Sequence, residues 1–204
     1  MKIDIIESIF TSNTYIIHIE NKVYIIDPAV NVKKIQEYIN EDEKVFGILI
    51  THGHIDHIYY LNECVNCFKA KTYCSKYAKE MIENNEHNCS YEMGLDKKIT
   101  LLNDSTIYVE DNYLIDDIIK CIETPGHSLD SITYEIEDNL FTGDTLFDRN
   151  IGRSDLYSGD EDILKASIKK LMNLDEHTIY PGHGNYGSLK MQLIYNYYVL
   201  NLMK

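Results

Sequence analysis

The run Thr51-His-Gly-His-Ile-Asp-His57 constrains this chain of 204 residues more than any other stretch. It holds three imidazoles and a carboxylate, which are ligand types that first-row divalent metals accept. The apolar segment Val45–Ile50 comes directly before it and predicts a buried strand. Polar metal-ligand types gathered at the end of an apolar strand favour a metal site over a core position.

Three later motifs supply further candidate ligands. They are Pro125-Gly-His127, Gly143-Asp144 and Pro181-Gly-His-Gly184, and together with the first run they contain five of the eight histidines. A single histidine is more often an ordinary core or surface residue. A whole constellation of ligand types points to a functional site instead.

These four motifs resemble the metallo-β-lactamase superfamily. The HxHxDH run, a histidine after Pro-Gly, a Gly-Asp and a final Gly-His stand in that family's order, and the resemblance covers nearly the whole chain. It implies an α+β fold, namely an αββα sandwich of two mixed β-sheets packed face to face with helices outside. The length predicts a single domain over residues 1–204.

The resemblance also implies a site for two divalent ions. The residues matched to the first ion are His52, His54 and His127. The residues matched to the second ion are Asp56, His57 and His183. Asp144 matches the bridging carboxylate, and Asp56 and Asp144 are the expected catalytic residues. The spacing of His52 and His54 agrees, because residues two apart in an extended segment point to one side. Zinc is the first candidate metal, with iron or manganese as alternatives, since all three accept this ligand mixture.

The segment from Gly143 to Asp155 indicates a branch of the family. Gly143-Asp-Thr-Leu-Phe147 followed by Ile151-Gly-Arg-Ser-Asp155 resembles the short glyoxalase II-like hydrolases. Asn196-Tyr-Tyr198 stands where those proteins carry Asn-Pro-aromatic. The implied activity is hydrolysis of a small thioester by a hydroxide held between the two ions. A thiolate leaves without a proton, whereas an amide nitrogen needs a donor, so a thioester is favoured over a β-lactam.

Three departures from that pattern bear on the substrate. Tyr59-Tyr60 replaces the usual Gly-Gly, Leu129-Asp130 replaces a Pro-Gly, and Tyr197 replaces a proline. The first departure is expected to reshape the mouth of the pocket. Tyr59, Arg153 and Asp155 are therefore the candidate substrate residues, and a buried salt bridge that pins the loop is the alternative for Arg153 and Asp155.

Other chemistries with the same motifs remain open. An iron-dependent persulfide dioxygenase is the main rival, because such enzymes also carry a Gly-Arg-Thr-Asp run. A nucleic-acid phosphodiesterase is disfavoured by the net charge of −14, and a non-enzymatic zinc protein by the intact set of ligands.

Composition sets the expected partners and location. The acidic charge argues against nucleic acid, and the chain has no run of eighteen apolar residues that would span a membrane. An early acidic N-terminus without a signal-peptide core predicts a cytoplasmic protein. The five cysteines are an odd number and are expected to be reduced thiols. The expected partner is a small thioester, and a homodimer is one candidate for the oligomeric state.

The secondary structure is predicted from periodicity and turn residues. Strands are expected at 3–6, 15–19, 22–26, 48–50, 71–74, 105–109, 118–123, 131–136, 139–142 and 178–180. Helices are expected at 32–40, from an N-cap at Ser75 to about 84, from an N-cap at Asp160, and at 188–202, with the tyrosines of the last helix in the core. Residues 86–102 are expected to form a loop, with a single helical turn within it as the alternative. Asp27 either orients the ligand loop, as in the family, or simply ends a strand before Pro28.

Overall fold

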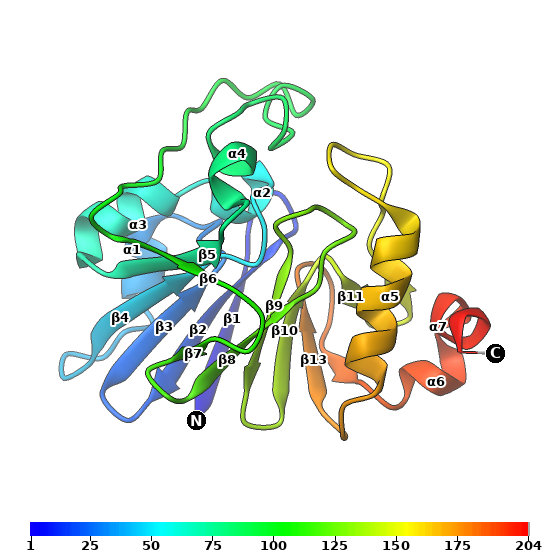
Figure 1. The fold of residues 1–204 in the computed structure, drawn as a ribbon. Coiled ribbons are helices and arrows are strands. Elements are labelled where there is room, and N and C mark those ends of the chain that lie inside the picture. Colours follow the sequence, from blue (N-terminus) through cyan, green and yellow to red (C-terminus); the bar gives the residue numbers. More distant parts are fainter. Residues whose placement is uncertain (204) are drawn as a thin grey trace. The chain divides into compact units, whose positions relative to one another are not determined.

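The computed structural model describes residues 1–203, which divide into two compact units. The first unit comprises Met1–Tyr108, and the second begins at Val109. Each unit is built around one six-stranded sheet (Figure 1). The expectation of a single domain over residues 1–204 stays a prediction.

The sheet of the first unit has the order β1-β2-β3-β4-β5-β6. Its strands are β1 (Lys2–Glu7), β2 (Asn13–Ile19), β3 (Lys22–Ile26), β4 (Lys44–Leu49), β5 (Lys71–Ser75) and β6 (Thr106–Val109). The pairs β1–β2 and β2–β3 are antiparallel, and β3–β4 and β4–β5 are parallel, so the sheet is mixed. Each expected strand of this half is confirmed, because β-branched and aromatic residues dominate these segments.

Four short helices accompany this sheet. They are α1 (Val32–Gln36), α2 (Ile55–Ile58), α3 (Leu61–Phe68) and α4 (Ala78–Ile82). Helices α1 and α3 lie against one face of the sheet (Figure 1). Ile35, Leu61 and Val65 from these helices join Ile25 and Ile48 from the strands in one buried apolar cluster. Burial of these side chains holds helices that are too short to be stable alone.

Two helix predictions in this half were wrong at their ends. The helix expected at 32–40 ends at Gln36. Ser75 is not an N-cap, because β5 continues through it and its hydroxyl accepts a hydrogen bond from the backbone nitrogen of Tyr77 at 3.2 Å. Helix α4 therefore begins only at Ala78. Residues 86–102 contain no helix or strand, as expected.

The sheet of the second unit has the order β14-β13-β10-β9-β8-β7. Its strands are β7 (Leu114–Ile115), β8 (Ile119–Glu123), β9 (Ile132–Ile136), β10 (Asn139–Gly143), β13 (Thr178–Pro181) and β14 (Gly187–Ser188). A separate ribbon of β11 (Leu146–Phe147) and β12 (Asn150–Ile151) follows β10. Among the described strands of this sheet, only β10 and β13 pair in parallel, so the carboxyl ends of these two strands lie at the same end of the sheet.

Helix α5 (Glu161–Met172) covers this second sheet (Figure 1). Asp160 caps it as predicted, with its carboxylate accepting from the backbone nitrogens of Asp162 and Ile163 at 2.9 Å each. The periodicity of this helix predicts an apolar face that includes Ile163, Leu164 and Ile168. Leu164 and Ile168 are buried, but Ile163 is 43% exposed, so its assignment to that face is wrong.

The single helix expected at 188–202 is wrong. The structure has two short helices, α6 (Gln192–Tyr195) and α7 (Tyr197–Leu202), separated by Asn196. Asn196 has an extended backbone and caps α7 with its side chain. The break turns Tyr197 and Tyr198 outward, and they are 70% and 50% exposed rather than in the core.

The described residues include no helix that is long and apolar enough to cross a membrane. All five cysteines are free thiols, as expected.

The turn between β8 and β9, which packs against α5, generates a stability prediction. Gly126 has φ +129°, and a Cβ at this position would lie 2.2 Å from the backbone nitrogen of Leu164. We expect Gly126→Ala to lower the free energy of unfolding by roughly 2–4 kcal/mol, because it adds both backbone strain and a steric clash. Urea unfolding measures the change.

Gly94→Ala is the matched control. Gly94 has φ +69° but no atom within 4 Å of the added Cβ, so the cost should be about 1 kcal/mol of strain alone. Equal losses in the two variants would contradict a packing role for Gly126.

Candidate metal centre

In the first unit, the ligand run begins where β4 ends. The chain leaves the sheet after Leu49 and passes through the run into α2. His52 and His54 are buried, with Nε2 of His52 and Nδ1 of His54 3.1 Å apart. Two ligands bound to one tetrahedral zinc ion lie about 3.4 Å apart, so this spacing fits a shared ion. The expectation that these two histidines face one side is confirmed.

Asp56 and His57 lie on the four residues of α2. Nε2 of His57 is 3.6 Å from Oδ2 of Asp56, and its ring centroid is 4.3 Å from that of His52. The first unit therefore brings all four of its predicted ligands together. A nitrogen and a carboxylate oxygen at this separation again suit a common divalent cation.

Asp27 orients this loop. The residue is buried, with φ +52°, and its Oδ2 accepts from Nδ1 of His57 at 2.9 Å and from the hydroxyl of Thr51 at 2.6 Å. Its Oδ1 accepts from the backbone nitrogen of Thr51 at 2.8 Å. Because Nδ1 of His57 carries the donated proton, the lone pair stays on Nε2, the atom that approaches Asp56. The family role of Asp27 is thus favoured over a simple strand end.

Two more residues position this loop and were missed in the sequence. The hydroxyl of Ser12 donates to the carbonyl oxygen of Asp56 at 2.5 Å, and the hydroxyl of Thr51 lies 3.1 Å from Nδ1 of His52. Thr51 was seen only as the first residue of the motif. No local pattern marks Ser12, because its partner is far away along the chain.

In the second unit, Asp144 lies between two histidines. Its Oδ2 is 3.8 Å from Nε2 of His127 and 3.6 Å from Nε2 of His183. Asp144 follows β10 and His183 follows β13, and these parallel strands end at the same edge of the sheet. The backbone nitrogen of Gly182 donates to the carbonyl oxygen of Gly143 at 2.8 Å and ties the two motifs together. The two predicted histidine ligands of this unit therefore lie close to one oxygen of the third ligand, Asp144.

The backbone at residues 152 and 153 lies close to His127 and fixes the orientation of its ring. Its Nδ1 donates to the carbonyl oxygen of Arg153 at 2.7 Å, which leaves the lone pair on Nε2, the atom that faces Asp144. The preceding residue is Gly152, where a Cβ would lie 1.8 Å from the carbonyl oxygen of Asp144. Glycine is required here because any side chain would push this backbone away from both ligands.

The candidate substrate residues are placed as follows. Arg153 and Asp155 form a bidentate ion pair, with distances of 2.7 and 2.8 Å, but their side chains are 60% and 70% exposed. The alternative of a buried salt bridge is therefore wrong. The Arg153 guanidinium holds the pKa of Asp155 at about 2. In the first unit, Tyr59 follows α2 and packs on Phe10, with ring centroids 5.2 Å apart.

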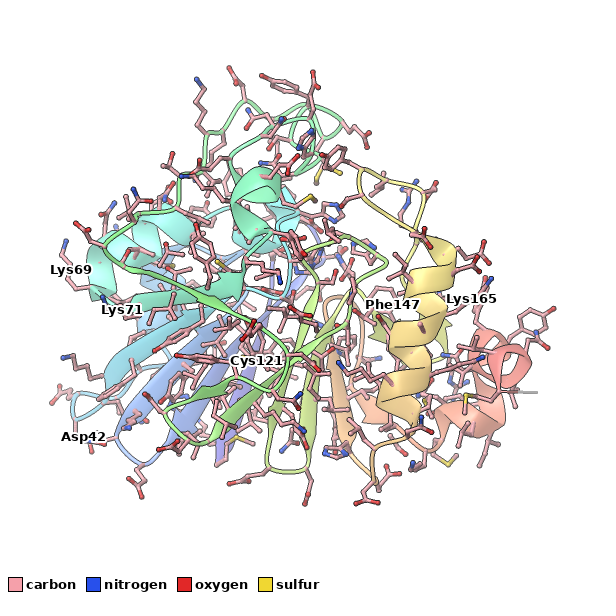
Figure 2. All side chains as sticks on the ribbon, in the orientation of Figure 1. Asp42, Lys69, Lys71, Cys121, Phe147 and Lys165 are labelled. Atoms are coloured by element: carbon pink, nitrogen blue, oxygen red, sulfur yellow. The ribbon has the colours of Figure 1, made fainter. Side chains whose placement is uncertain are left out.

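A surface hollow of about 550 Å³ in the first unit lies away from these ligands. Asn66, Lys69, Lys71 and Asp104 help to line it. Figure 2 shows Lys69 and Lys71 where α3 ends and β5 begins. The ligand run instead lies beyond the carboxyl end of β4. Because β4 and β5 are parallel, the hollow at the amino end of β5 is at the opposite end of these strands.

A family model described as the metallo-beta-lactamase superfamily matches residues 9–183. The chain belongs to this superfamily, whose members are typically metal-dependent hydrolases.

Two relatives illustrate the sequence match. A probable metallo-hydrolase, YqgX of Bacillus subtilis, is 32% identical over 179 residues, which cover 85% of each chain. A hydroxyacylglutathione hydrolase of Shewanella loihica is 32% identical over 162 residues, covering 78% of this chain and 56% of the relative.

Two solved structures confirm the α+β class and the metallo-β-lactamase-like fold. The B3 metallo-beta-lactamase BLEG-1 has a TM-score of 0.88 at 27% identity, covering 97% of this chain and 99% of that one. TTHA1623, crystallised in a di-iron-bound form, has a TM-score of 0.87 at 23% identity, covering 97% and 100%.

The orienting carboxylate generates a metal-affinity prediction. In Asp27→Asn, an amide nitrogen placed at the Oδ2 position can accept a hydrogen bond from neither the Thr51 hydroxyl nor His57. We expect metal affinity to fall roughly 10- to 100-fold, because His57 loses the partner that fixes its tautomer. Competition with a chromophoric chelator measures the affinity.

Asp4→Asn is the matched control. Asp4 also contacts a histidine, His18, at 3.0 Å, but this pair lies outside the ligand run. Unchanged metal affinity in Asp27→Asn, or an equal loss in Asp4→Asn, would contradict the orienting role.

Proposed function

We propose that this chain is a binuclear metal-dependent hydrolase that cleaves a small thioester. The observation that carries the proposal is the position of Oδ2 of Asp144, within 3.8 Å of the Nε2 atoms of both His127 and His183. A single carboxylate oxygen beside two ligand nitrogens is the arrangement expected of a bridge between two cations.

The donor set fits such a centre. Following the family's ligand order, His52, His54 and His127 would hold one ion, and Asp56, His57 and His183 the other, with Asp144 bridging. Bound divalent ions supply Lewis acidity and a hydroxide nucleophile at neutral pH. The ligands would be held in place by Asp27 on His57 and by the Arg153 carbonyl on His127.

The leaving group favours a thioester. A thiolate departs without protonation, so the site needs no proton donor at that position. The similarity to a hydroxyacylglutathione hydrolase supports this substrate class. In the proposal, Tyr59 and the pair of Arg153 and Asp155 contact the substrate. A substrate carboxylate would then have to compete with Asp155 for the Arg153 guanidinium.

Zinc is the proposed metal, and iron is the alternative to test beside it. The ligands are nitrogen and oxygen atoms that both metals accept. TTHA1623, which shares the fold, has been crystallised with two irons.

The bridge generates an activity prediction. We expect Asp144→Asn to lower kcat by roughly a thousandfold or more, because the neutral amide cannot hold two cations together. Steady-state kinetics and elemental analysis of the same preparation measure turnover and metal content. Asp138→Asn, at the exposed turn that precedes β10, is the control and should change neither. Near wild-type turnover with two ions bound in Asp144→Asn would reject the bridge.

The proposed reaction is tested against its main rival with two metals. Enzyme loaded with zinc should release free thiol from acyl-thioesters in the absence of oxygen, and elemental analysis should approach two ions per chain. A persulfide dioxygenase would instead consume oxygen and require a redox-active metal. Oxygen uptake from a glutathione-type persulfide with iron only, and no thioester cleavage, would overturn the hydrolase proposal.

A further inference from the structure

Helix α2, which carries Asp56 and His57, depends on contacts from outside. It has only four residues, Ile55–Ile58, and a helix of this length is not stable in water. Its position is therefore set by the segments that hold its two ends.

One irregular segment reaches both ends of this helix. The segment 84–97, which we call the brace, contains no helix or strand. At the first end, the backbone nitrogen of Ile55 donates to the carbonyl oxygen of Asn88 at 2.8 Å. Asn88 is fully buried and its amide donates to the carbonyl oxygen of Ile82 in α4 at 2.9 Å, which anchors the brace.

At the other end, the brace contacts the two tyrosines that follow α2. The ammonium nitrogen of Lys97 lies 4.1 Å from the ring centroid of Tyr59 and 4.7 Å from that of Tyr60. The same nitrogen is 2.8 Å from Oε1 of Glu63, and the Lys97 side chain is 23% exposed. A cation that contacts two rings and a carboxylate and is largely shielded from water interacts more strongly with the rings than an exposed lysine does.

We propose that Lys97 is a positioning residue that holds α2, and with it Asp56 and His57, in the geometry needed to bind metal. The inference rests on the metal centre proposed above. The cation and the two rings join the end of α2 to the brace, and the brace in turn holds the beginning of α2 through Asn88. Lys97 does not touch the ligands and acts through Tyr59 and Tyr60.

This role accounts for a departure from the family pattern. Tyr59 and Tyr60 replace a Gly-Gly, and their φ angles are −52° and −109°. Both are ordinary for residues with side chains, so the backbone does not demand glycine here. The exchange supplies two ring faces, and Lys97 is the cation placed over both of them.

The contact also couples metal binding to order in the brace. If the brace fixes the ligands on α2, bound metal must stabilise the brace by the same amount. Other contacts on α2, from Ser12 and Asp27, come from the ends of regular strands. The brace is the support that contains no helix or strand, and Lys97 is the side chain that joins it to the end of α2.

Cobalt binding to the purified full-length protein tests the proposal. We expect Lys97→Met to bind Co²⁺ about five- to tenfold more weakly and to shift the visible ligand-field bands, because Asp56 and His57 change position. Lys97→Arg should restore both, since a guanidinium also stacks on aromatic rings. Lys98→Met, which removes the neighbouring exposed lysine, should match the wild type.

Hydrogen exchange of the metal-free protein gives a second measurement. In Lys97→Met, amides of residues 55–60 and of the brace should exchange faster together, and in Lys98→Met neither group should change. If Lys97→Met does not fold, Tyr60→Leu removes one ring face and should show the same changes more weakly.

The outcomes separate the two proposals. A lower Tm in Lys97→Met with wild-type cobalt affinity and bands would mean that Lys97 is structural only, and would overturn the inference while leaving the metal centre intact. A wild-type protein that binds no cobalt would reject the metal centre, and this inference with it.

Discussion

The buried carboxylate of Asp27 is the contact on which the geometry of the ligand run depends. A carboxylate that is nearly inaccessible to water is costly unless its oxygens accept hydrogen bonds. Asp27 accepts three, two from Thr51 and one from His57, and these join the end of β3 to the loop after β4 and to α2. The cost of burying the charge therefore favours this arrangement, because loss of a donor removes one of the hydrogen bonds that offset that cost. The positive φ at Asp27 is one conformational cost of placing the carboxylate there.

In the second unit, a backbone carbonyl oxygen rather than a carboxylate orients the ligand histidine. The carbonyl oxygen of Arg153 orients His127, and Gly152 allows this backbone segment to lie against Asp144. In both units the acceptor binds Nδ1, so the Nε2 lone pair is directed toward a carboxylate. One unit uses a buried charge and the other a close backbone contact, and both fix the tautomer of a ligand histidine.

The sequence predicted those features that depend on local patterns. The strands, the N-cap at Asp160 and the cluster of ligands within residues 52–57 follow from residue types that are close along the chain. The ligands His127, Asp144 and His183 are far apart along the chain, and only the family resemblance grouped them. The single C-terminal helix was wrong because the capping preference of Asn196 outweighed the helical periodicity around it. A four-residue helix such as α2 has no period to detect. Other features depend on tertiary structure, which no local pattern records. They are the exposure of Arg153 and Asp155 and the contact of Lys97 with Tyr59.

The charge distribution limits the substrate further. The chain carries a net charge of −14, and only two of its cations are arginines. Both guanidiniums are already engaged, Arg153 by Asp155 and Arg149 by Asp148 at 3.7 Å and by the ring of Tyr195 at 4.8 Å. A thiol carrier with several phosphates would meet an acidic protein whose strongest anion-binding groups have intramolecular partners. The proposed thioester is therefore expected to be small and to carry little negative charge, and to gain its specificity from the acyl group and from contacts with side chains such as Tyr59.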